Sequence, residues 1–440
     1  MNRILSIELR RSAALGSALV LFVTGVVLLA LDGTVFTTGW MQLAMTQRLY
    51  LAVLWPLALA AGAWQAGRER RSKVAELFAS TPRPRTHRAL PTLIAMAVAV
   101  VCGYLAMGIA GGLRIIGTAE YLPVAAFAVT AVGALALIAA VWLGLAIGRL
   151  LPWLVTAPAL GIAGMGLLLL IPAATRPHGW LALTFSPIHE MNLPGAYTTV
   201  PGRASVAQAL WLAALAVTAV MLLASSGWRT RVAALLPVAL GAALAITVMP
   251  HQNRLVTDAI DPVARELVCT EDKPRVCVSR VHSGLLPEVT APAREGLAAL
   301  AKLPDAPTMV HEDTTTYVPE SYPPWRTDVV LLSVEVGDDG HIADRTDVRV
   351  EVAAGAFASP PRCENVVDMA DRIAAAHWLI GREPAAASKS FALADSERAV
   401  ELWNDLRQLP GREAEARVLA LRQAAVNCTA GNGLFSGSTP

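Results

Sequence analysis

Seven long apolar runs take up most of the first 250 residues and leave little choice of fold. Each run is close to the roughly 20 residues that a helix needs to cross a bilayer. Because hydrocarbon cannot pair backbone polar groups, such runs span membranes as helices. The whole chain is 55% hydrophobic and only 16% charged, as is typical of membrane proteins. We predict a polytopic α-helical membrane domain over residues 1–250, with about seven spans near 13–31, 46–66, 89–113, 121–148, 152–173, 205–225 and 231–249.

Charge divides the chain into two parts of opposite sign. Residues 1–250 contain 17 Lys and Arg against 6 Asp and Glu, whereas residues 251–440 contain 19 against 28. The positive residues gather in alternate loops, above all in 67–88, while the loops between them carry single arginines such as Arg48. The positive-inside rule then predicts a cytoplasmic N-terminus and an extracytoplasmic C-terminal part. Basic residues at span ends give no reason to expect a nucleic-acid partner. No charged residue lies in the middle of a predicted span, which argues against an ion-coupled carrier.

The basic segment 67–88 is predicted to contain a short amphipathic helix over residues 68–80. Val74, Leu77 and Phe78 follow the i, i+3, i+4 spacing of one apolar stripe. The Thr81-Pro82 pair ends this helix, because the residue before a proline is disfavoured in the α conformation. A soluble partner can push on such a helix, although an ordinary basic loop is the alternative interpretation.

Four segments of the membrane part match one family of membrane proteins: IELRRS at 7–12, GRERR at 67–71, ELFASTPRPR at 76–85 and, more weakly, FSP at 185–187. With these segments the membrane part resembles the permease subunits of ABC-2 type transporters, in the form found in actinobacteria. The resemblance covers residues 1–228 and implies an elbow helix at the N-terminus and a coupling helix that contacts an ATPase subunit. A signal peptide is the alternative for the N-terminal residues. The chain departs from the usual six spans by a seventh span and an added external domain. The residues placed at the ATPase contact are Arg70, Arg71, Val74, Leu77, Phe78 and Arg83.

This resemblance implies a permease subunit of an ABC-type exporter in the bacterial plasma membrane, moving a hydrophobic or amphipathic substrate. A P-loop requires Gly-Lys-[Ser/Thr], and none of the four lysines follows a glycine. ATP and magnesium are therefore expected on a separate ATPase, with no cofactor in this chain. The other expected partners are the lipid bilayer and a second permease, either another copy or a paralogue. Two alternatives stay open: a membrane-anchored extracytoplasmic sensor or immunity protein, and a membrane-bound hydrolase with degenerate motifs.

Residues 251–430 have the length and pattern of a separate extracytoplasmic α+β domain. Strands come first and helices later, which is the order that suggests this class. Residues 431–440 are expected to form a disordered tail. The predicted strands are 266–270, 275–281, 329–336 and 348–352, and the predicted helices are 286–303, 364–380, 393–408 and 412–427.

Four of the five cysteines fall in this second part of the chain. An even number of cysteines in an oxidising compartment predicts disulfides, which we assign as Cys269 with Cys277 and Cys363 with Cys428. A zinc site made of all four thiolates is the alternative, although these cysteines lack the close pair spacing of such sites. Cys102 lies alone in the third span, as a small apolar residue.

Other candidate sites have weak sequence support, so we do not expect an enzyme. His178 and His189 are possible metal ligands in an outer loop, and Asp338-Asp339 is a possible calcium site, but solvated loop residues explain both. His311-Glu312 is not followed by the second histidine of a zincin helix. A nucleophile made of Cys277 and His282 requires a free thiol, whereas we expect that thiol to be in a disulfide.

Overall fold

The chain divides into two compact units. We call residues Met1–Ile115 and Leu122–Asp261 the membrane unit, and residues Ile116–Tyr121 and Pro262–Pro440 the sheet unit. The boundary lies at residue 261 rather than at 250. The structure, a computed structural model, describes residues 12–33, 36–68, 85–188, 195–225, 227–251, 258–317, 320–385, 391–429, 431 and 433–435.

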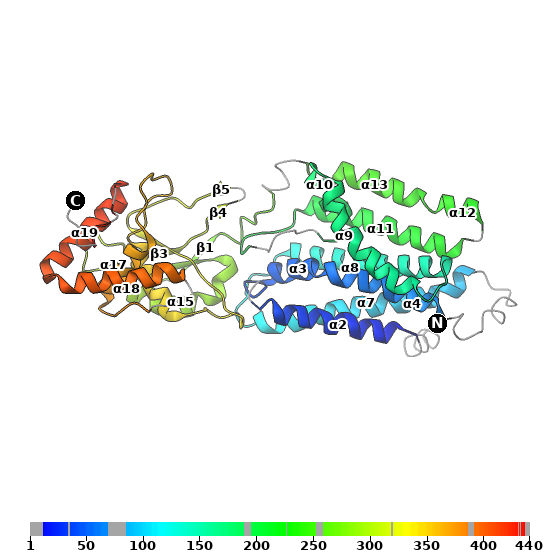
Figure 1. Ribbon diagram of the computed structural model, residues 1–440, viewed down its shortest axis with the longest axis horizontal. Coiled ribbons are helices and arrows are strands. Elements are labelled where there is room, and N and C mark those ends of the chain that lie inside the picture. Colours follow the sequence, from blue (N-terminus) through cyan, green and yellow to red (C-terminus); the bar gives the residue numbers. More distant parts are fainter. Residues whose placement is uncertain are drawn as a thin grey trace. The chain divides into compact units, whose positions relative to one another are not determined.

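The membrane unit is built of helices, with one isolated β-bridge between Thr198 and Ile260 (Figure 1). Six of its helical segments are long and apolar enough to cross a membrane, and the bent pair α3–α4 makes a possible seventh span. Its helices are α2 (Ala14–Leu31), α3 (Trp40–Leu49), α4 (Leu51–Ala66), α7 (Arg85–Ile115), α8 (Val124–Leu150), α9 (Thr156–Ala174), α10 (Gly179–Phe185), α11 (Gly202–Ala224), α12 (Trp228–Ala233) and α13 (Leu236–Val248).

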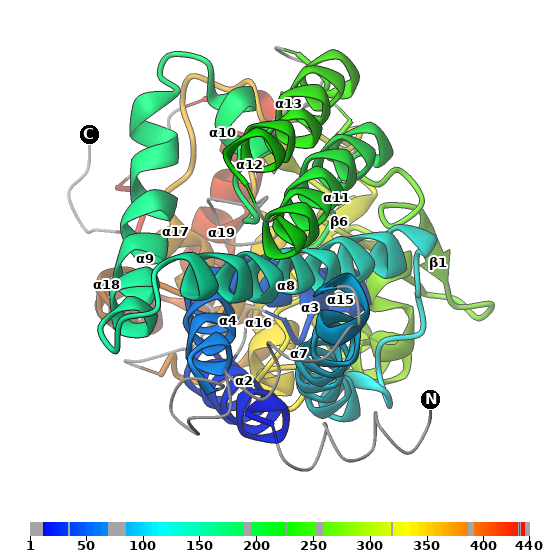
Figure 2. The same ribbon diagram turned by 90° about the vertical axis from the view of Figure 1, so that its right-hand side faces the viewer.

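Helix α8 is the centre of this unit. It contacts α3, α4 and α7 on one side and α11 on the other, as the view along the bundle shows (Figure 2). Close approach to α4 depends on glycines on both helices. A methyl group at Gly62 would overlap the carbonyl oxygen of Val141, and one at Gly144 would overlap that of Leu59. Small residues let membrane helices gain van der Waals contact where no hydrophobic effect drives their association.

Two pairs of glycines spaced four residues apart, Gly108 with Gly112 and Gly144 with Gly148, pack against other helices of this chain. Gly144 and Gly148 both face α4, where a methyl group at Gly148 would lie 2.7 Å from the Cα of Ala63. Gly108 and Gly112 face side chains of α3, namely Gln47 and Trp40. These four positions are therefore occupied by intrachain packing.

The second span differs from its prediction. It begins at Trp40 rather than at 46, and the axes of α3 and α4 are bent by 51° at the break between them. Tyr50 lies at this break, and its hydroxyl donates to Asp32 Oδ2 at 2.8 Å at the end of α2. The earlier start moves Arg48 from the edge of the predicted span, where it was counted with the outer arginines, into the interior of the bent helix pair, so that prediction was wrong.

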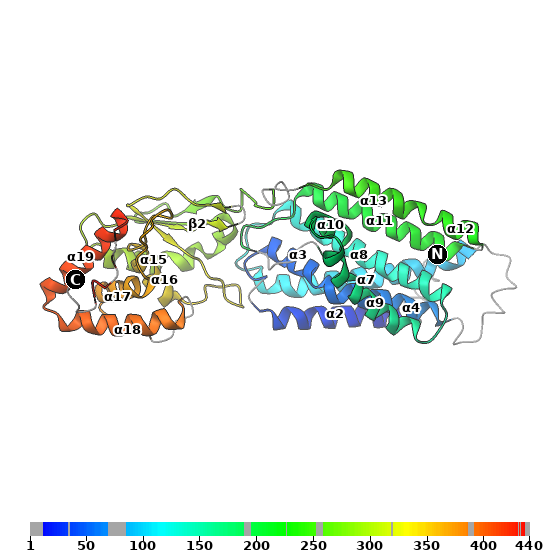
Figure 3. The same ribbon diagram turned by 45° about the horizontal axis from the view of Figure 1, so that its top comes forward.

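In the sheet unit, helices cover one face of a four-stranded sheet (Figure 3). The strand order is β1-β2-β3-β6, with β1 antiparallel to β2 and the other neighbours parallel. A separate hairpin joins β4 to β5. The elements are β1 (Leu267–Cys269), β2 (Arg275–Ser279), the 3₁₀ helix η1 (Arg280–Leu285), α15 (Leu286–Leu300), β3 (Met309–Glu312), β4 (Thr316–Tyr317), β5 (Glu320–Ser321), β6 (Val329–Leu332), α16 (Arg345–Gly355), α17 (Met369–Ile380), α18 (Leu393–Gln408) and α19 (Gly411–Asn427).

Residues 348–352 were predicted as a strand, and this prediction was wrong because they lie in α16. The alternation of Val348, Val350 and Val352 arises because this helix is buried on two sides. Val348 and Val352 belong to the main core, whereas Val350 packs into a second cluster with Ala376 of α17. The Asp344 side chain caps the helix by accepting a hydrogen bond from Thr346 N.

The short loop between α7 and α8 belongs to the sheet unit although it joins two membrane helices. Its residue Thr118 packs so closely on η1 that a methyl group at Gly284 would overlap the Thr118 carbonyl oxygen. Ser283 Oγ donates to Glu120 Oε2 at 3.0 Å in the same contact. The sheet unit is thus attached to the ends of α7 and α8 as well as to the segment after α13.

The predicted start of the disordered tail, residue 431, is too early in the chain. Phe435 is 1% exposed and belongs to the core of the sheet unit, and the Leu434 carbonyl accepts a hydrogen bond from Arg417. An apolar side chain this close to the C-terminus therefore closes the core instead of remaining in solvent. Residues 436–440 lie outside the described residues.

The four cysteines of the sheet unit form two pairs at disulfide-bonding distance, Cys269 with Cys277 and Cys363 with Cys428. The first pair joins facing residues of β1 and β2, with Cα atoms 4.0 Å apart. The second joins the segment before α17 to the end of α19, with Cα atoms 5.3 Å apart. Paired sulfurs leave no thiolates for the alternative four-cysteine zinc site.

The two disulfides are expected to differ in their contribution to stability. They close loops with sequence separations of 8 and 65 residues, and a longer closed loop removes more entropy from the unfolded chain. Replacing both Cys363 and Cys428 by serine should lower the free energy of unfolding of the sheet unit by about 4 kcal/mol, against about 2.5 kcal/mol for Cys269 and Cys277. Denaturant titration of the detergent-solubilised chain measures both, and a larger loss from the shorter loop would contradict this account.

Candidate functional site

A fully buried arginine lies inside the membrane unit, where the sequence predicted an outer-loop residue. Arg48 is in the last turn of α3, directly before the break at Tyr50, and is 1% exposed. An ionisable side chain buried in a membrane domain is expensive and by default indicates function. We therefore take the surroundings of Arg48 as the candidate functional site.

The guanidinium of Arg48 binds neutral groups only. Its Nε and Nη2 donate to the Pro187 carbonyl at 3.2 and 2.8 Å, and Nη2 also donates to Gln208 Oε1 at 2.9 Å. Gln208, on α11, in turn donates to the Leu183 carbonyl at 2.7 Å. Arg48 thereby holds the segment after α10 against α11. No ion pair joins it to a carboxylate in the described part of the chain.

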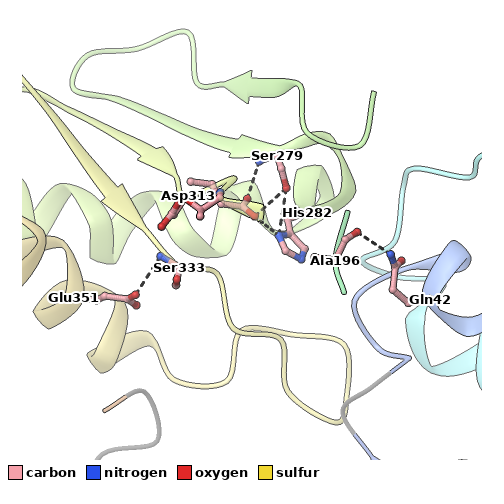
Figure 4. Close-up of polar contacts among 9 residues, drawn as sticks. Gln42, Ala196, Ser279, His282, Asp313, Ser333 and Glu351 are labelled. Atoms are coloured by element: carbon pink, nitrogen blue, oxygen red, sulfur yellow. Dashed lines mark hydrogen bonds and ion pairs between the residues drawn. The ribbon is translucent and has the colours of Figure 1, made fainter. Parts of the chain in front are cut away.

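A second side chain of α3 holds the segment before α11. Gln42 Nε2 donates to the carbonyls of Gly195 and Ala196, at 3.0 and 2.7 Å (Figure 4). Helix α3 contains four buried polar residues, Gln42, Thr46, Gln47 and Arg48. Two of them, Gln42 and Arg48, supply partners to backbone that the helices leave unpaired.

Three donors near Arg48 have no hydrogen-bond partner among the described residues. They are Arg48 Nη1, the hydroxyl of Tyr104 on α7, and Gln47 Nε2. A methyl group at Gly133 on α8 would overlap the Tyr104 hydroxyl and lie 3.0 Å from Arg48 Cδ, so these two side chains share one place on α8. Gln47 Nε2 lies against Gly108, one helical turn after Tyr104. Two further side-chain atoms of α3, Gln42 Oε1 and Thr46 Oγ1, also have no partner among the described residues.

The sheet unit contains a separate buried polar cluster at the carboxyl ends of its parallel strands (Figure 4). Glu312, at the end of β3, accepts hydrogen bonds from the backbone N–H and the hydroxyl of Ser279, at 2.7 and 2.9 Å. His282 Nδ1 lies 2.6 Å from the same carboxylate, which places its proton on Nδ1. A hydrolytic triad needs serine and carboxylate on opposite ring nitrogens, whereas here both lie at Nδ1. This arrangement therefore fixes the strand ends and does not activate a serine.

A buried carboxyl on α16 adds a titrating group to the same end of the sheet. The pKa of Glu351 is raised to about 7, chiefly by burial and also by the nearby charge of Glu335, while a hydrogen bond from Ser333 N opposes the shift. The Ser333–Glu351 contact is drawn in Figure 4.

The sequence-predicted sites have mixed outcomes. The predicted ATPase contact, residues 70–83, lies outside the described residues, as do the N-terminal residues 1–11 and His189. His178 lies edge-on to Trp180, with ring centroids 6.4 Å apart. Asp339 accepts a hydrogen bond from the backbone N–H of His341, as expected of a turn residue. No cluster of three or more metal-ligating side chains occurs within the described ranges. Cys277 is paired with Cys269, so it supplies no nucleophile.

Sequence reasoning missed Arg48 because a lone arginine beside an apolar run resembles a loop residue. One signal was present in the chain: four polar residues, Gln42, Thr46, Gln47 and Arg48, stand directly before the apolar run. Tyr104 and Gln208, in contrast, carried no signal, since isolated polar residues are common in long apolar helices.

No protein-family model, curated protein or solved structure matches the chain.

The raised pKa of Glu351 predicts a pH-dependent stability effect. A carboxyl whose folded pKa exceeds its unfolded value stabilises the protein at low pH, and this stabilisation is lost as pH rises through the folded pKa near 7. Glu351→Gln keeps the acceptor for Ser333 and removes the charge. We expect it to raise the free energy of unfolding by about 1–2 kcal/mol at pH 8 and to leave it nearly unchanged at pH 5.

Thermal unfolding of the full chain at the two pH values tests this expectation. Glu401→Gln is the matched control, because Glu401 is an exposed residue of α18. An equal gain for Glu351→Gln at both pH values would mean that charge burial is not the cause.

Proposed function

We propose that the chain is the membrane-spanning permease subunit of an ABC-type exporter, which moves a hydrophobic or amphipathic substrate with energy from a separate ATPase. The second permease of the complex is another copy or a paralogue. The observation that carries this proposal is the position of α7 (Arg85–Ile115). This single 31-residue helix begins within the last residues of the basic segment 67–88 and leads into the loop 116–121 of the sheet unit.

Two independent signals agree on the orientation of α7. Clustered Arg and Lys favour the cytoplasmic side for the segment before its N-terminus. Cysteine pairs at bonding distance favour an oxidising compartment for the sheet unit at its C-terminus. A 31-residue helix is about 46 Å long, enough to cross a bilayer with its headgroups. We therefore place the chain in the bacterial plasma membrane, with a cytoplasmic N-terminus and an extracytoplasmic sheet unit.

This arrangement gives a mechanical route from one side of the membrane to the other. A soluble ATPase that moves the basic segment would move α7, and the loop 116–121 would carry that motion to η1 through Thr118 and Gly284. The close backbone contact at this point leaves no slack for the loop to move alone. An exporter can use such a link to open its outer end when ATP is consumed.

The apolar stripe of the basic segment supplies the first test. An ATPase groove that buries Leu77 and Phe78 gains roughly 1.5–3 kcal/mol for each fully buried side chain. The double variant Leu77→Asp and Phe78→Asp should therefore lose ATPase binding in a pull-down and lose stimulated ATP hydrolysis, while membrane insertion stays intact.

The matched control replaces Arg70 and Arg71 by alanine, which should have a smaller effect because exposed ion pairs contribute little. The candidate ATPase is the one that co-purifies with the wild-type chain. Full ATPase binding by the double-Asp variant would refute the coupling assignment and favour the alternative of a membrane-anchored sensor.

Single cysteines test the orientation. In a Cys102→Ala background, Lys73→Cys should be protected from a membrane-impermeant thiol reagent in intact cells, whereas Asp338→Cys should react. Asp338 is chosen because it is an exposed turn residue. Permeabilised cells, in which both should react, are the control. The reverse pattern in intact cells would place the basic segment outside and exclude the proposed coupling.

A further inference from the structure

We propose that the Arg48 site binds the anionic head group, phosphate or carboxylate, of an amphipathic molecule. This inference deepens the proposed function, because it assigns an acidic head group to the transported substrate. It depends on three observations within the membrane unit: an uncompensated charge, buried donors that have no partner among the described residues, and a broken helix beside them.

The charge of Arg48 is uncompensated in the described part of the protein. Arginine stays protonated in proteins, and its partners here are a carbonyl and an amide, which are neutral. Its Nη1 has no hydrogen-bond partner in the described part of the chain. Burying an unpaired charge is strongly unfavourable. Binding of an anion would pair the Arg48 charge and is therefore favoured.

The donors around Arg48 have the composition of an anion site. The Tyr104 hydroxyl is completely buried and unpartnered, and it meets the Arg48 side chain at Gly133. Gln47 Nε2 adds a third unpartnered donor from the neighbouring position on α3. Phosphate and carboxylate oxygens are the acceptors that an arginine fork matches best. A neutral substrate would leave the charge of Arg48 unpaired.

The break between α3 and α4 places this site where a transporter can alter it. Discontinuous membrane helices commonly form substrate sites, since their ends and nearby side chains can interact with ligands. Arg48 lies two residues before Tyr50, where the helix axis bends by 51°. A change of this bend would move Arg48 relative to Tyr104 on α7 and would open or close the space between their unpartnered donors.

A purely structural role for Arg48 accounts for only part of the geometry. Nε and Nη2 hold the Pro187 carbonyl and Gln208, and that anchoring needs neither Nη1 nor the Tyr104 hydroxyl. Removing a buried hydroxyl that has no partner should not destabilise the protein. Tyr104→Phe therefore separates anion binding from anchoring.

The same helix junction supplies a matched control. The Tyr50 hydroxyl is satisfied inside the protein, donating to Asp32 Oδ2 at 2.8 Å and to the Leu28 carbonyl at 3.1 Å. Tyr50→Phe loses these bonds and should lower the melting temperature, but it leaves the Arg48 and Tyr104 donors in place, so anion binding should weaken less than in Tyr104→Phe protein. Tyr104→Phe should weaken anion binding and leave the melting temperature of the ligand-free protein unchanged. The two variants remove the same atom type from neighbouring helices, so their contrast does not depend on a general effect of tyrosine loss.

The experiment uses the purified full-length chain in dodecyl maltoside, a neutral detergent, without any ATPase. Dodecyl phosphate is the probe, and its binding is measured by native mass spectrometry and by the shift in melting temperature. We expect saturable binding of one molecule per chain, weakened roughly tenfold or more by Tyr104→Phe, as for the loss of one hydrogen bond to a charged group. Arg48→Met should abolish binding, and Arg48→Lys should retain a weaker form.

Further probes assign the source of the anion. Binding of inorganic phosphate that depends on Tyr104 identifies the head group alone as sufficient, and equal binding of phosphatidylglycerol identifies a bilayer lipid as a ligand. Selective binding of dodecyl phosphate supports a transported single-chain amphiphile. All three outcomes support an anion site.

Equal affinity in wild-type and Tyr104→Phe protein, or no saturable binding of any of these probes, would overturn the proposal. The Tyr104→Phe and Tyr50→Phe pair keeps this decision possible even where Arg48→Met does not fold. Because no ATPase is present, failure here leaves the pull-down result of the proposed function unaffected, and the two can be judged separately.

Discussion

Inside a bilayer, every backbone N–H and C=O must find its partner within the protein, since hydrocarbon offers none. The membrane unit meets this requirement with helices wherever the chain is regular. Where the chain is irregular, before α11, polar side chains of α3 supply the missing partners: Arg48 pairs the Pro187 carbonyl, and Gln42 pairs those of Gly195 and Ala196. The same requirement explains why a helix as polar as α3 is buried. Its polar residues serve the backbone of a distant segment.

Close helix packing connects the surroundings of Arg48 to the rest of the membrane unit. Gly62 and Gly144 bring α4 and α8 into backbone contact, and Gly133 leaves room on α8 for Tyr104 and Arg48. Tightly packed elements move as bodies and not as independent side chains. A shift at the break between α3 and α4 would therefore be felt at α8, and through α8 at α11. The unpartnered donors lie at the centre of this packing, where a ligand would have the largest effect on it.

The two units show different limits of sequence reasoning. In the sheet unit, α15, α18 and α19 were predictable, because each buries one face and keeps the 3.6-residue period. Helix α16 was not, since burial on two sides gave Val348, Val350 and Val352 the alternation of a strand. The short strand β3 was also missed. Its buried residue Glu312 is polar, and only contact with Ser279 and His282 explains that burial.

The approximate number and extent of the apolar helices could be predicted from the sequence alone. So could the change from apolar to charged composition near residue 250 and the cysteines able to pair. These properties depend on local composition and on the dimensions of a bilayer, so no knowledge of the fold is needed. The tertiary structure decided that Arg48 is buried and that Tyr104 and Gln208 lie beside it. It also decided that the loop 116–121 packs on η1. These facts depend on which segments meet across more than a hundred residues of chain, and residue patterns along one segment carry no record of that meeting.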